Sequence, residues 1–235
     1  MTKCVVSLSG GMDSTVLLYH ASKMYDEVLA LFFEYGQRHI KEYECAKYHA
    51  NKLKNVTLKK IDVTFFKEIA TQSSLLNSAI DVAKAKDVMG DPQTVNYVPF
   101  RNMMLLSIAS AAAETFGATK VLYGAAQADS VAGYWDGSEE FLHAINSVNI
   151  LNRRNKIGIE APLIEKSKSE IIQWGIDLGV DYKNTWTCYE GKEQACGECT
   201  ACSLRLKGFI DAGFIDPVPY SKNINWSALG AVPLN

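Results

Sequence analysis

The chain of 235 residues can form one α/β domain with a sizeable core and a small appendage, because 48% of its residues are hydrophobic and 21% are charged. A net charge of −2 and a pI near 6.1 argue against a broad polyanion-attracting field, so we expect a small-molecule ligand and no nucleic-acid partner. The sequence has no recognisable signal peptide and no apolar run of membrane-spanning length, which predicts a cytoplasmic protein without a membrane partner.

Short β-branched runs alternate with helical patterns along most of the chain. Strands are expected at residues 3–8, 27–33, 56–63 and 119–123, with an edge strand at 158–164. Helices are expected at residues 13–22, 38–53, 102–116, 138–149 and 167–178. This alternation predicts a doubly wound parallel sheet with right-handed crossovers. Residues 62–96 predict a short helix within a mobile excursion, and residues 215–235 an extended tail.

A glycine-rich loop, SGGMDS at residues 9–14, lies between the first expected strand and the helix that follows it. Gly10 and Gly11 allow the backbone to turn tightly, and the free amides at a helix start favour an anion such as phosphate. The loop has neither the Lys of a Walker loop nor the GxGxxG spacing of a dinucleotide fold. An ordinary glycine turn, with Asp13 and Ser14 capping the helix, is the alternative.

Four of the six cysteines are close together near the C-terminus, and their number and type predict a closed structural zinc site. These are Cys188, Cys196, Cys199 and Cys202. An iron–sulfur cluster is the rival, although the spacing matches neither usual ferredoxin pattern. Cys4 and Cys45 are expected to be small buried hydrophobic residues. We therefore divide the chain into an α/β domain at 1–180 and a zinc-binding region with the tail at 181–235.

Further segments resemble the 7-cyano-7-deazaguanine synthases, which are a family of N-type ATP pyrophosphatases. The SGGMDS loop is similar to the pyrophosphate-binding loop of these pyrophosphatases. The further segments are FEYGQRH at 33–39 with Glu42, VPFRN at 98–102, Asp129 with GYWD at 133–136, and TCY at 187–189 with the CxxCxxC segment. The resemblance implies an adenine-nucleotide alpha-hydrolase-like fold, a homodimer, and ATP, Mg²⁺ and zinc as cofactors. It also implies that ATP adenylates the carboxylate of 7-carboxy-7-deazaguanine, that ammonia displaces AMP, and that a second ATP drives dehydration of the amide to the nitrile.

The resemblance also implies residue functions. The ATP-binding residues would be Leu8, Ser9, Gly10, Gly11, Met12, Asp13, Ser14 and Thr15, with Asp13 holding Mg²⁺ and pyrophosphate. Asp13, Ser14 and Arg101 would be catalytic, with Arg101 offsetting charge on the α-phosphate. The substrate-binding residues would be Tyr35, Gln37, Arg38, Asn102, Asp129, Tyr134, Asp136 and Lys168. Packing, capping or surface positions remain the alternative for each of them.

Three positions depart from the family pattern: Met12 replaces Gln, Phe100 replaces Gly, and Trp135 replaces Pro in a segment that also lacks an Arg. These departures leave open a variant that stops at the amide. The sequence is also compatible with a tRNA-thiolating pyrophosphatase, which would need a redox-active cysteine, and with a nucleotide-binding regulator without catalysis. His20, His49 and His143 are expected at surface or boundary positions and receive no function.

Overall fold

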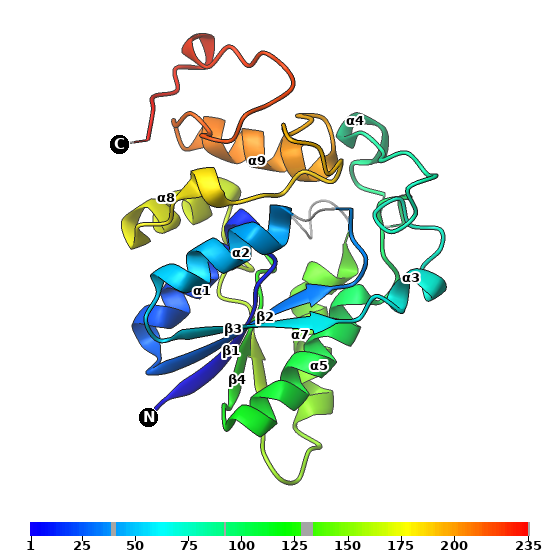
Figure 1. The fold of residues 1–235 in the computed structure, drawn as a ribbon, viewed down its shortest axis with the longest axis vertical. Helices are drawn as coiled ribbons and strands as arrows, with labels where there is room; N and C mark the ends of the chain where they lie inside the picture. Colours follow the sequence, from blue (N-terminus) through cyan, green and yellow to red (C-terminus); the bar gives the residue numbers. More distant parts are fainter. Residues whose placement is uncertain (39–40, 92, 128–133, 235) are drawn as a thin grey trace.

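A five-stranded parallel sheet forms the centre of the computed structural model, which describes residues 1–38, 41–91, 93–127 and 134–234 (Figure 1). Its strands are β1 (Lys3–Ser7), β2 (Glu27–Glu34), β3 (Val56–Asp62), β4 (Lys120–Leu122) and β5 (Gly158–Glu160), in the order β3-β2-β1-β4-β5. All neighbouring strands are parallel, which confirms the predicted doubly wound sheet. β5 ends before its predicted bound because Pro162 cannot donate to a ladder.

Helices cover both faces of this sheet. They are α1 (Met12–Met24), α2 (Lys41–Lys52), α3 (Phe66–Ile69), α4 (Ala85–Val88), α5 (Arg101–Phe116), α7 (Glu139–Asn149), α8 (Lys168–Leu178) and α9 (Thr200–Asp211). Short 3₁₀ turns are η1 (Trp135–Gly137), η2 (Tyr182–Asn184) and η3 (Ser227–Leu229). No helix among the described residues combines the length and the apolar content needed to cross a membrane.

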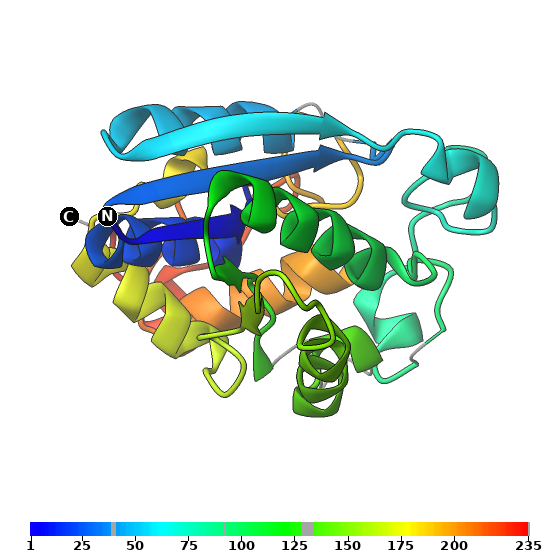
Figure 2. The same ribbon diagram turned by 90° about the horizontal axis from the view of Figure 1, so that it is seen from below.

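The alternation of β1 decides which helix covers which face. Val6 packs with Leu17 of α1 on one side, whereas Val5 packs with Leu106 of α5 on the other. Helices α1 and α2 therefore lie above the sheet in Figure 1, and α5 and α7 lie below it, as the view in Figure 2 also shows. Helices α8 and α9 form a further layer outside α1, with Phe209 of α9 fully buried in their shared core.

Helix α9 is an element that the sequence pattern did not indicate. It begins directly after Cys199, and Cys202 lies in its first turn, so the expected metal site is attached to a rigid helix. Arg205 and Phe209 lie on its buried face. Because a buried arginine interrupts the apolar stripe, the helical periodicity of hydrophobic residues in this segment is weak.

The excursion between β3 and α5 contains two short helices, where one was predicted, and lies beside the carboxyl ends of β2 and β3 (Figure 1). The side chain of Asn96 organises it: Oδ1 accepts hydrogen bonds from Ser74 Oγ (2.7 Å) and from the Ala83 amide (3.0 Å), and Nδ2 donates to the Ala83 carbonyl. Buried Leu75 and Val98 pack within the excursion. A polar side chain thus satisfies backbone groups that a helix or strand would otherwise pair.

The C-terminal tail runs over α9 without regular structure other than η3 (Figure 1). Ile215 donates its amide to the Val232 carbonyl at 2.7 Å, and Ala195 donates to the Pro219 carbonyl at 2.9 Å. These bonds attach the tail both to itself and to the cysteine-containing loop, as the proline-bearing sequence predicts for an extended surface segment.

The predicted surface or boundary position of His49 is wrong, because its side chain is fully buried. Its Nδ1 lies 3.0 Å from the Tyr19 hydroxyl and its Nε2 lies 3.1 Å from the Asn184 carbonyl oxygen. Burial lowers the pKa of His49 to about 4, so the ring is neutral at neutral pH. This imidazole ties α2 to α1 and to η2.

We predict that Gly175→Ala destabilises the protein by about 1–3 kcal/mol, because a methyl group there would collide with the Tyr182 hydroxyl and lie 2.7 Å from a Val16 methyl. That hydroxyl is held in place by hydrogen bonds, since it donates to helix carbonyls at 3.0 and 3.2 Å. Urea unfolding measures the change. The matched control is Gly179→Ala, where φ is +83° but no atom lies nearby, so only backbone strain of about 1 kcal/mol is expected. A Gly175→Ala protein as stable as the parent would contradict this packing.

Candidate active site

A cavity of about 280 Å³ opens at the carboxyl ends of the central strands, where parallel sheets of this kind usually bind ligands. It is enclosed by the glycine-rich loop, the ends of β2 and β4, the start of α5, η1, and the segment leading into α9. Many predicted site residues line it together: Ser9, Gly11, Met12, Asp13, Ser14, Tyr35, Arg101, Asn102, Tyr134, Asp136 and Lys168. The predicted residues Leu8, Gly10, Thr15, Gln37 and Arg38 are not in its described lining, and Asp129 lies outside the described residues.

The glycine-rich loop is braced by its own serines. Ser14 Oγ accepts from the Ser9 amide (3.1 Å) and donates to the Gly11 carbonyl (3.2 Å), while Ser9 Oγ accepts from the Gly11 amide (3.2 Å). Gly11 is the N-cap residue of α1 and provides no side chain to cap the helix. The first amides of α1 therefore keep the positive end of a 13-residue helix at the cavity, which favours an anion.

Gly10 permits close contact of three backbone segments. Its φ is +79°, and a Cβ atom there would collide with the carbonyl of Glu42 in α2. Its own carbonyl accepts from the Trp186 amide at 2.9 Å. Gly10 thus shapes the loop, as do the buried residues Leu8 and Thr15. Direct contact of these three residues with a ligand stays a prediction.

Asp13 faces the cavity from the first turn of α1. Its Oδ2 forms an ion pair with Lys168 Nζ at 2.9 Å, so Asp13 is not a helix cap. Its Oδ1 is buried and has no hydrogen-bond partner among the described residues. Leaving a buried carboxylate oxygen without a partner costs free energy, and such an oxygen is a hard ligand of the type that Mg²⁺ prefers. The residues present therefore fit a magnesium ion at this end of the cavity.

The other end of the cavity contains a cation surrounded by acidic and phenolic groups. Arg101 donates to the Tyr35 hydroxyl at 3.4 Å, and its guanidinium lies 5.6 Å from the centre of that ring. Burial alone would lower the pKa of Arg101, but the Coulombic effects of Tyr35 and Asp136 outweigh it and raise the pKa. Burial raises the pKa of Asp136, and Arg101 partly opposes that shift. Glu42, which the sequence pattern left without a function, lies in the same lining.

Gln37 and Arg38 support the cavity rather than line it. Gln37 accepts from the Tyr35 amide at 2.9 Å and donates to the Phe33 carbonyl at 3.0 Å, which fixes the end of β2. Arg38 donates to the carbonyls of Ser74 and Asn77 at 2.7 and 2.9 Å and so anchors the excursion. Their contact with a substrate stays a prediction.

Two of the unusual residues form an aromatic cluster beside the cavity. Phe100 has a left-handed φ of 53° at the start of α5, and its ring lies 5.5 Å from that of Trp135. Trp135 donates its indole N–H to the Tyr97 hydroxyl at 2.9 Å. Neither Phe100 nor Trp135 belongs to the described lining, whereas Met12 borders the cavity from a side chain that is 1% exposed. Of the three positions that depart from the family pattern, Met12 is therefore the one that belongs to the described lining of the cavity.

The four clustered cysteines present one sulfur atom each to a common point, with all four sulfurs within 4.8 Å of one another. A tetrahedral zinc with Zn–S bonds of about 2.3 Å has S–S edges of about 3.8 Å, so only a small contraction is required. Backbone amides already support the sulfurs, since Cys196 donates to Cys188 Sγ and Cys199 donates to Cys196 Sγ, both at 3.3 Å. This cluster could hold a metal, and a metal bound by all four sulfurs would leave none of these four thiols for other chemistry.

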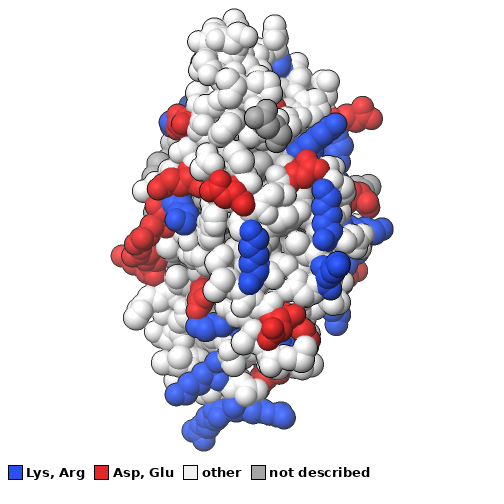
Figure 3. All heavy atoms as spheres, turned by 90° about the vertical axis from the view of Figure 1, so that its left-hand side faces the viewer, with Lys and Arg blue, Asp and Glu red and all other residues white. Residues whose placement is uncertain are grey.

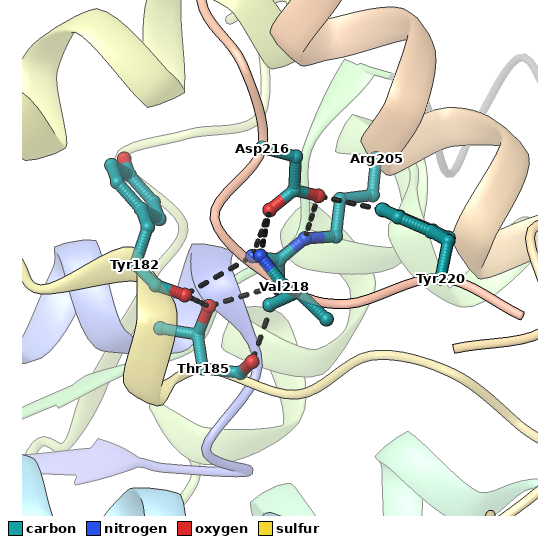
Figure 4. Close-up of polar contacts among 6 residues, drawn as sticks. All are labelled: Tyr182, Thr185, Arg205, Asp216, Val218 and Tyr220. Atoms are coloured by element: carbon teal, nitrogen blue, oxygen red, sulfur yellow. Dashed lines mark hydrogen bonds and ion pairs between the residues drawn. The ribbon is translucent and has the colours of Figure 1, made fainter. Parts of the chain in front are cut away.

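A buried ion pair, Arg205–Asp216, fixes the wall that α9 contributes to the cavity (Figure 4). Arg205 is 2% exposed, and its Nε and Nη2 reach the two Asp216 oxygens at 2.6 and 2.9 Å. It also donates to the Tyr182 carbonyl (3.2 Å) and the Thr185 hydroxyl (2.9 Å). Tyr220 donates to Asp216 at 2.6 Å. No sequence signal distinguishes this arginine from an exposed helical one, because its partners are distant in the chain.

Comparisons with known proteins decide the family. Residues 3–213 match the family described as "Queuosine biosynthesis protein QueC". Proteins named 7-cyano-7-deazaguanine synthase from a Nitratiruptor species and from Clostridium kluyveri are 44% and 41% identical to this chain over 223 and 226 residues. These matches cover 93% and 94% of this chain and 98% of each relative. This chain belongs to the 7-cyano-7-deazaguanine synthase family.

The fold of this synthase family member is also found in a solved structure with a different name. The NH3-dependent NAD synthetase from Campylobacter jejuni superposes with a TM-score of 0.50 and 17% identity, over 77% of this chain and 65% of that one. At this level of identity the likeness shows the fold alone.

We predict that Arg205→Met lowers the free energy of unfolding by about 3–5 kcal/mol, because it leaves the Asp216 carboxylate buried without its counter-charge. Guanidinium unfolding measures the loss. The double variant Arg205→Met with Asp216→Leu should recover much of it, since no charge then remains buried. As a control, Lys207→Ala removes the exposed i,i+4 pair with Asp211 and should change stability by less than about 0.5 kcal/mol. If Arg205→Met and Lys207→Ala lowered the free energy of unfolding by equal amounts, the structural importance of the buried pair would be contradicted.

Proposed function

We propose that this protein converts 7-carboxy-7-deazaguanine, ammonia and two molecules of ATP into 7-cyano-7-deazaguanine, two molecules of AMP and two of pyrophosphate. The observation that carries the proposal is a single cavity that joins a phosphate-binding loop to a pocket with a cation, aromatic rings and carboxyl groups. Family membership, with relatives of this name more than 40% identical, makes the same activity the best expectation for this chain.

The loop end of the cavity suits the triphosphate of ATP. The start of α1, with Ser9 and Ser14, would donate to phosphate oxygens, and Lys168 would add a positive charge from the start of α8. Asp13 would hold Mg²⁺ through the oxygen that has no protein partner, and the ion would offset the charge that accumulates on the phosphates.

The other end suits a planar deazapurine. Tyr35 and Tyr134 can provide the aromatic surface, and Asp136 and Asn102 can hydrogen-bond the guanine-like edge. Asp129 would add a further polar group, and Gln37 and Arg38 would shape the pocket from behind. Arg101 lies where it can stabilise the developing charge as the substrate oxygen attacks the α-phosphate. Asp13, Ser14 and Arg101 are thus the proposed catalytic residues.

We propose zinc as the metal of the cysteine cluster, because four thiolates with no open position suit a structural zinc ion. The ion would join the loop at 188–199 to α9, which lines the cavity. The activity itself would not involve this metal directly.

The three alternatives have less support. Phe100 and Trp135 are not among the described lining residues, which favours the full reaction over arrest at the amide. A thiolating enzyme would need a reactive cysteine outside the cluster, but burial raises the pKa of Cys4 to about 12 and that of Cys45 to about 11. A regulator without catalysis would not need the Asp13 oxygen that fits a metal ion.

The expected partners are the small-molecule substrates and a second copy of the chain. On the face drawn in Figure 3 acidic and basic side chains are interspersed, which favours a small-molecule substrate over nucleic acid as far as that face is concerned. The homodimer and the cytoplasmic location stay predictions from the family resemblance and the sequence.

We expect the purified protein, incubated with 7-carboxy-7-deazaguanine, Mg-ATP and ammonium, to form the nitrile together with AMP and pyrophosphate, as mass spectrometry would detect. The isosteric Asp13→Asn variant should be slower by about 10²–10³-fold, because it loses the charge that would hold the metal against the phosphates. Accumulation of the amide alone would mean a shortened activity. ATP binding without any AMP would instead support the regulator.

We expect one zinc ion per chain by elemental analysis, with no iron and no visible absorption typical of an iron–sulfur cluster. Cys202→Ser should weaken zinc binding by more than the roughly 10–100-fold that loss of a supporting hydrogen bond costs, as a competing chromogenic chelator would measure. Cys45→Ser, outside the cluster, is the matched control and should bind zinc as the parent does. Stoichiometric iron would overturn the assignment.

A further inference from the structure

Glu42 lines the cavity and has neighbours at both of its ends, since its backbone meets the glycine-rich loop and its carboxyl group interacts with Arg101. The missing side chain at Gly10 lets the first turn of α2 contact the glycine-rich loop directly at the backbone of Glu42. The Glu42 side chain also lies in the lining together with Tyr35 and Arg101. In the proposed reaction the reacting carbon would lie between these two ends, because that carbon is linked to the α-phosphate through one oxygen and carries the deazapurine ring on its other side.

The carboxyl group of Glu42 is poised to exchange protons near neutral pH. Burial raises its pKa to about 8, and the charge of Arg101 and a hydrogen bond from Gln37 limit the shift. Other charged groups in the lining come from α1, η1, α8 and α9: they are Asp13, Asp136, Lys168 and Arg205. Because the pKa is raised, the base form of Glu42 increases as the pH rises from 6 through about 8.

The proposed reaction removes three protons from one nitrogen atom, because ammonia carries three and the nitrile carries none. In the first round the C–N bond forms, AMP leaves with the electrons of the C–O bond, and one proton leaves nitrogen. In the second round the amide oxygen attacks the α-phosphate, pyrophosphate leaves, and a second N–H proton is lost. The third proton departs as AMP leaves and the C≡N bond forms. A base facing this nitrogen is needed in both rounds.

Resting on the proposed function, we propose that Glu42 is the general base that accepts these protons and releases each of them to water between steps. The described lining contains three carboxyl groups, those of Asp13, Glu42 and Asp136. Asp13 is paired with Lys168 at the phosphate loop. Asp136 lies on η1, and its carboxyl group accepts hydrogen bonds from its own backbone amide and from that of Asn102 in the first turn of α5. Glu42 alone among the three belongs to the helix that packs on the loop at Gly10.

The test separates adenylation from the steps that remove protons from nitrogen. Exchange of labelled pyrophosphate into ATP, with 7-carboxy-7-deazaguanine and without ammonia, measures adenylation. Glu42→Gln should leave this exchange within about 3-fold of the parent, while amide and nitrile formation fall by about 10²–10⁴-fold. With the amide as substrate, which avoids the titration of ammonia, the parent rate should rise with pH and level off above about 8. The variant should lack this dependence.

Two further variants complete the experiment. Formate should accelerate nitrile formation by Glu42→Ala, because it can replace the missing carboxylate. Asp136→Asn, the matched control, should instead weaken substrate binding and slow exchange and nitrile formation together. Equal loss of exchange and nitrile formation in Glu42→Gln, or no loss of either, would overturn the assignment of Glu42 while the parent's activity still supports the proposed function. A parent protein without exchange or nitrile would overturn both.

Discussion

Close backbone packing at Gly10 is the constraint on which the arrangement of the site depends. The glycine-rich loop, α2 and the segment before the cysteine cluster meet there, through contact with the Glu42 carbonyl and a hydrogen bond from the Trp186 amide. Any side chain at this position would separate the three segments. The glycine-rich loop, the helix that carries Glu42 and the cavity wall are therefore placed relative to one another by a residue that has no side chain of its own.

The C-terminal region contributes a wall to the cavity and is held by buried polar contacts in addition to the apolar packing of Phe209. Arg205 and Asp216 join α9 to the tail, and the same arginine reaches the carbonyl of Tyr182 in η2. The cysteine cluster fixes the start of α9 through Cys199 and Cys202. A buried ion pair contributes little net stability compared with apolar packing, but its geometry is strict. We infer that this pair, with any metal that the cysteine cluster binds, would hold the wall in one position against the sheet.

Charge is distributed unevenly along the cavity. At the loop end, the Asp13–Lys168 pair leaves one carboxylate oxygen without a partner, whereas at the other end Arg101 is surrounded by Tyr35 and Asp136. An anionic ligand would be held at the helix start and by the two cations, and a neutral ring would be held between aromatic side chains. The separation of these environments within one cavity suits a reaction that joins a phosphate to a planar heterocycle.

The sequence by itself determined the parallel α/β fold, the glycine-rich loop and the four-cysteine cluster, because hydrophobic periodicity, glycine turns and CxxC spacing are local properties of the chain. Tertiary structure decided the position of Glu42, the burial of His49 and the pairing of Arg205 with Asp216. It also turned Arg38 toward the excursion. In each of these cases the side chain has partners from segments distant in sequence, so its environment is set by packing that no local pattern encodes.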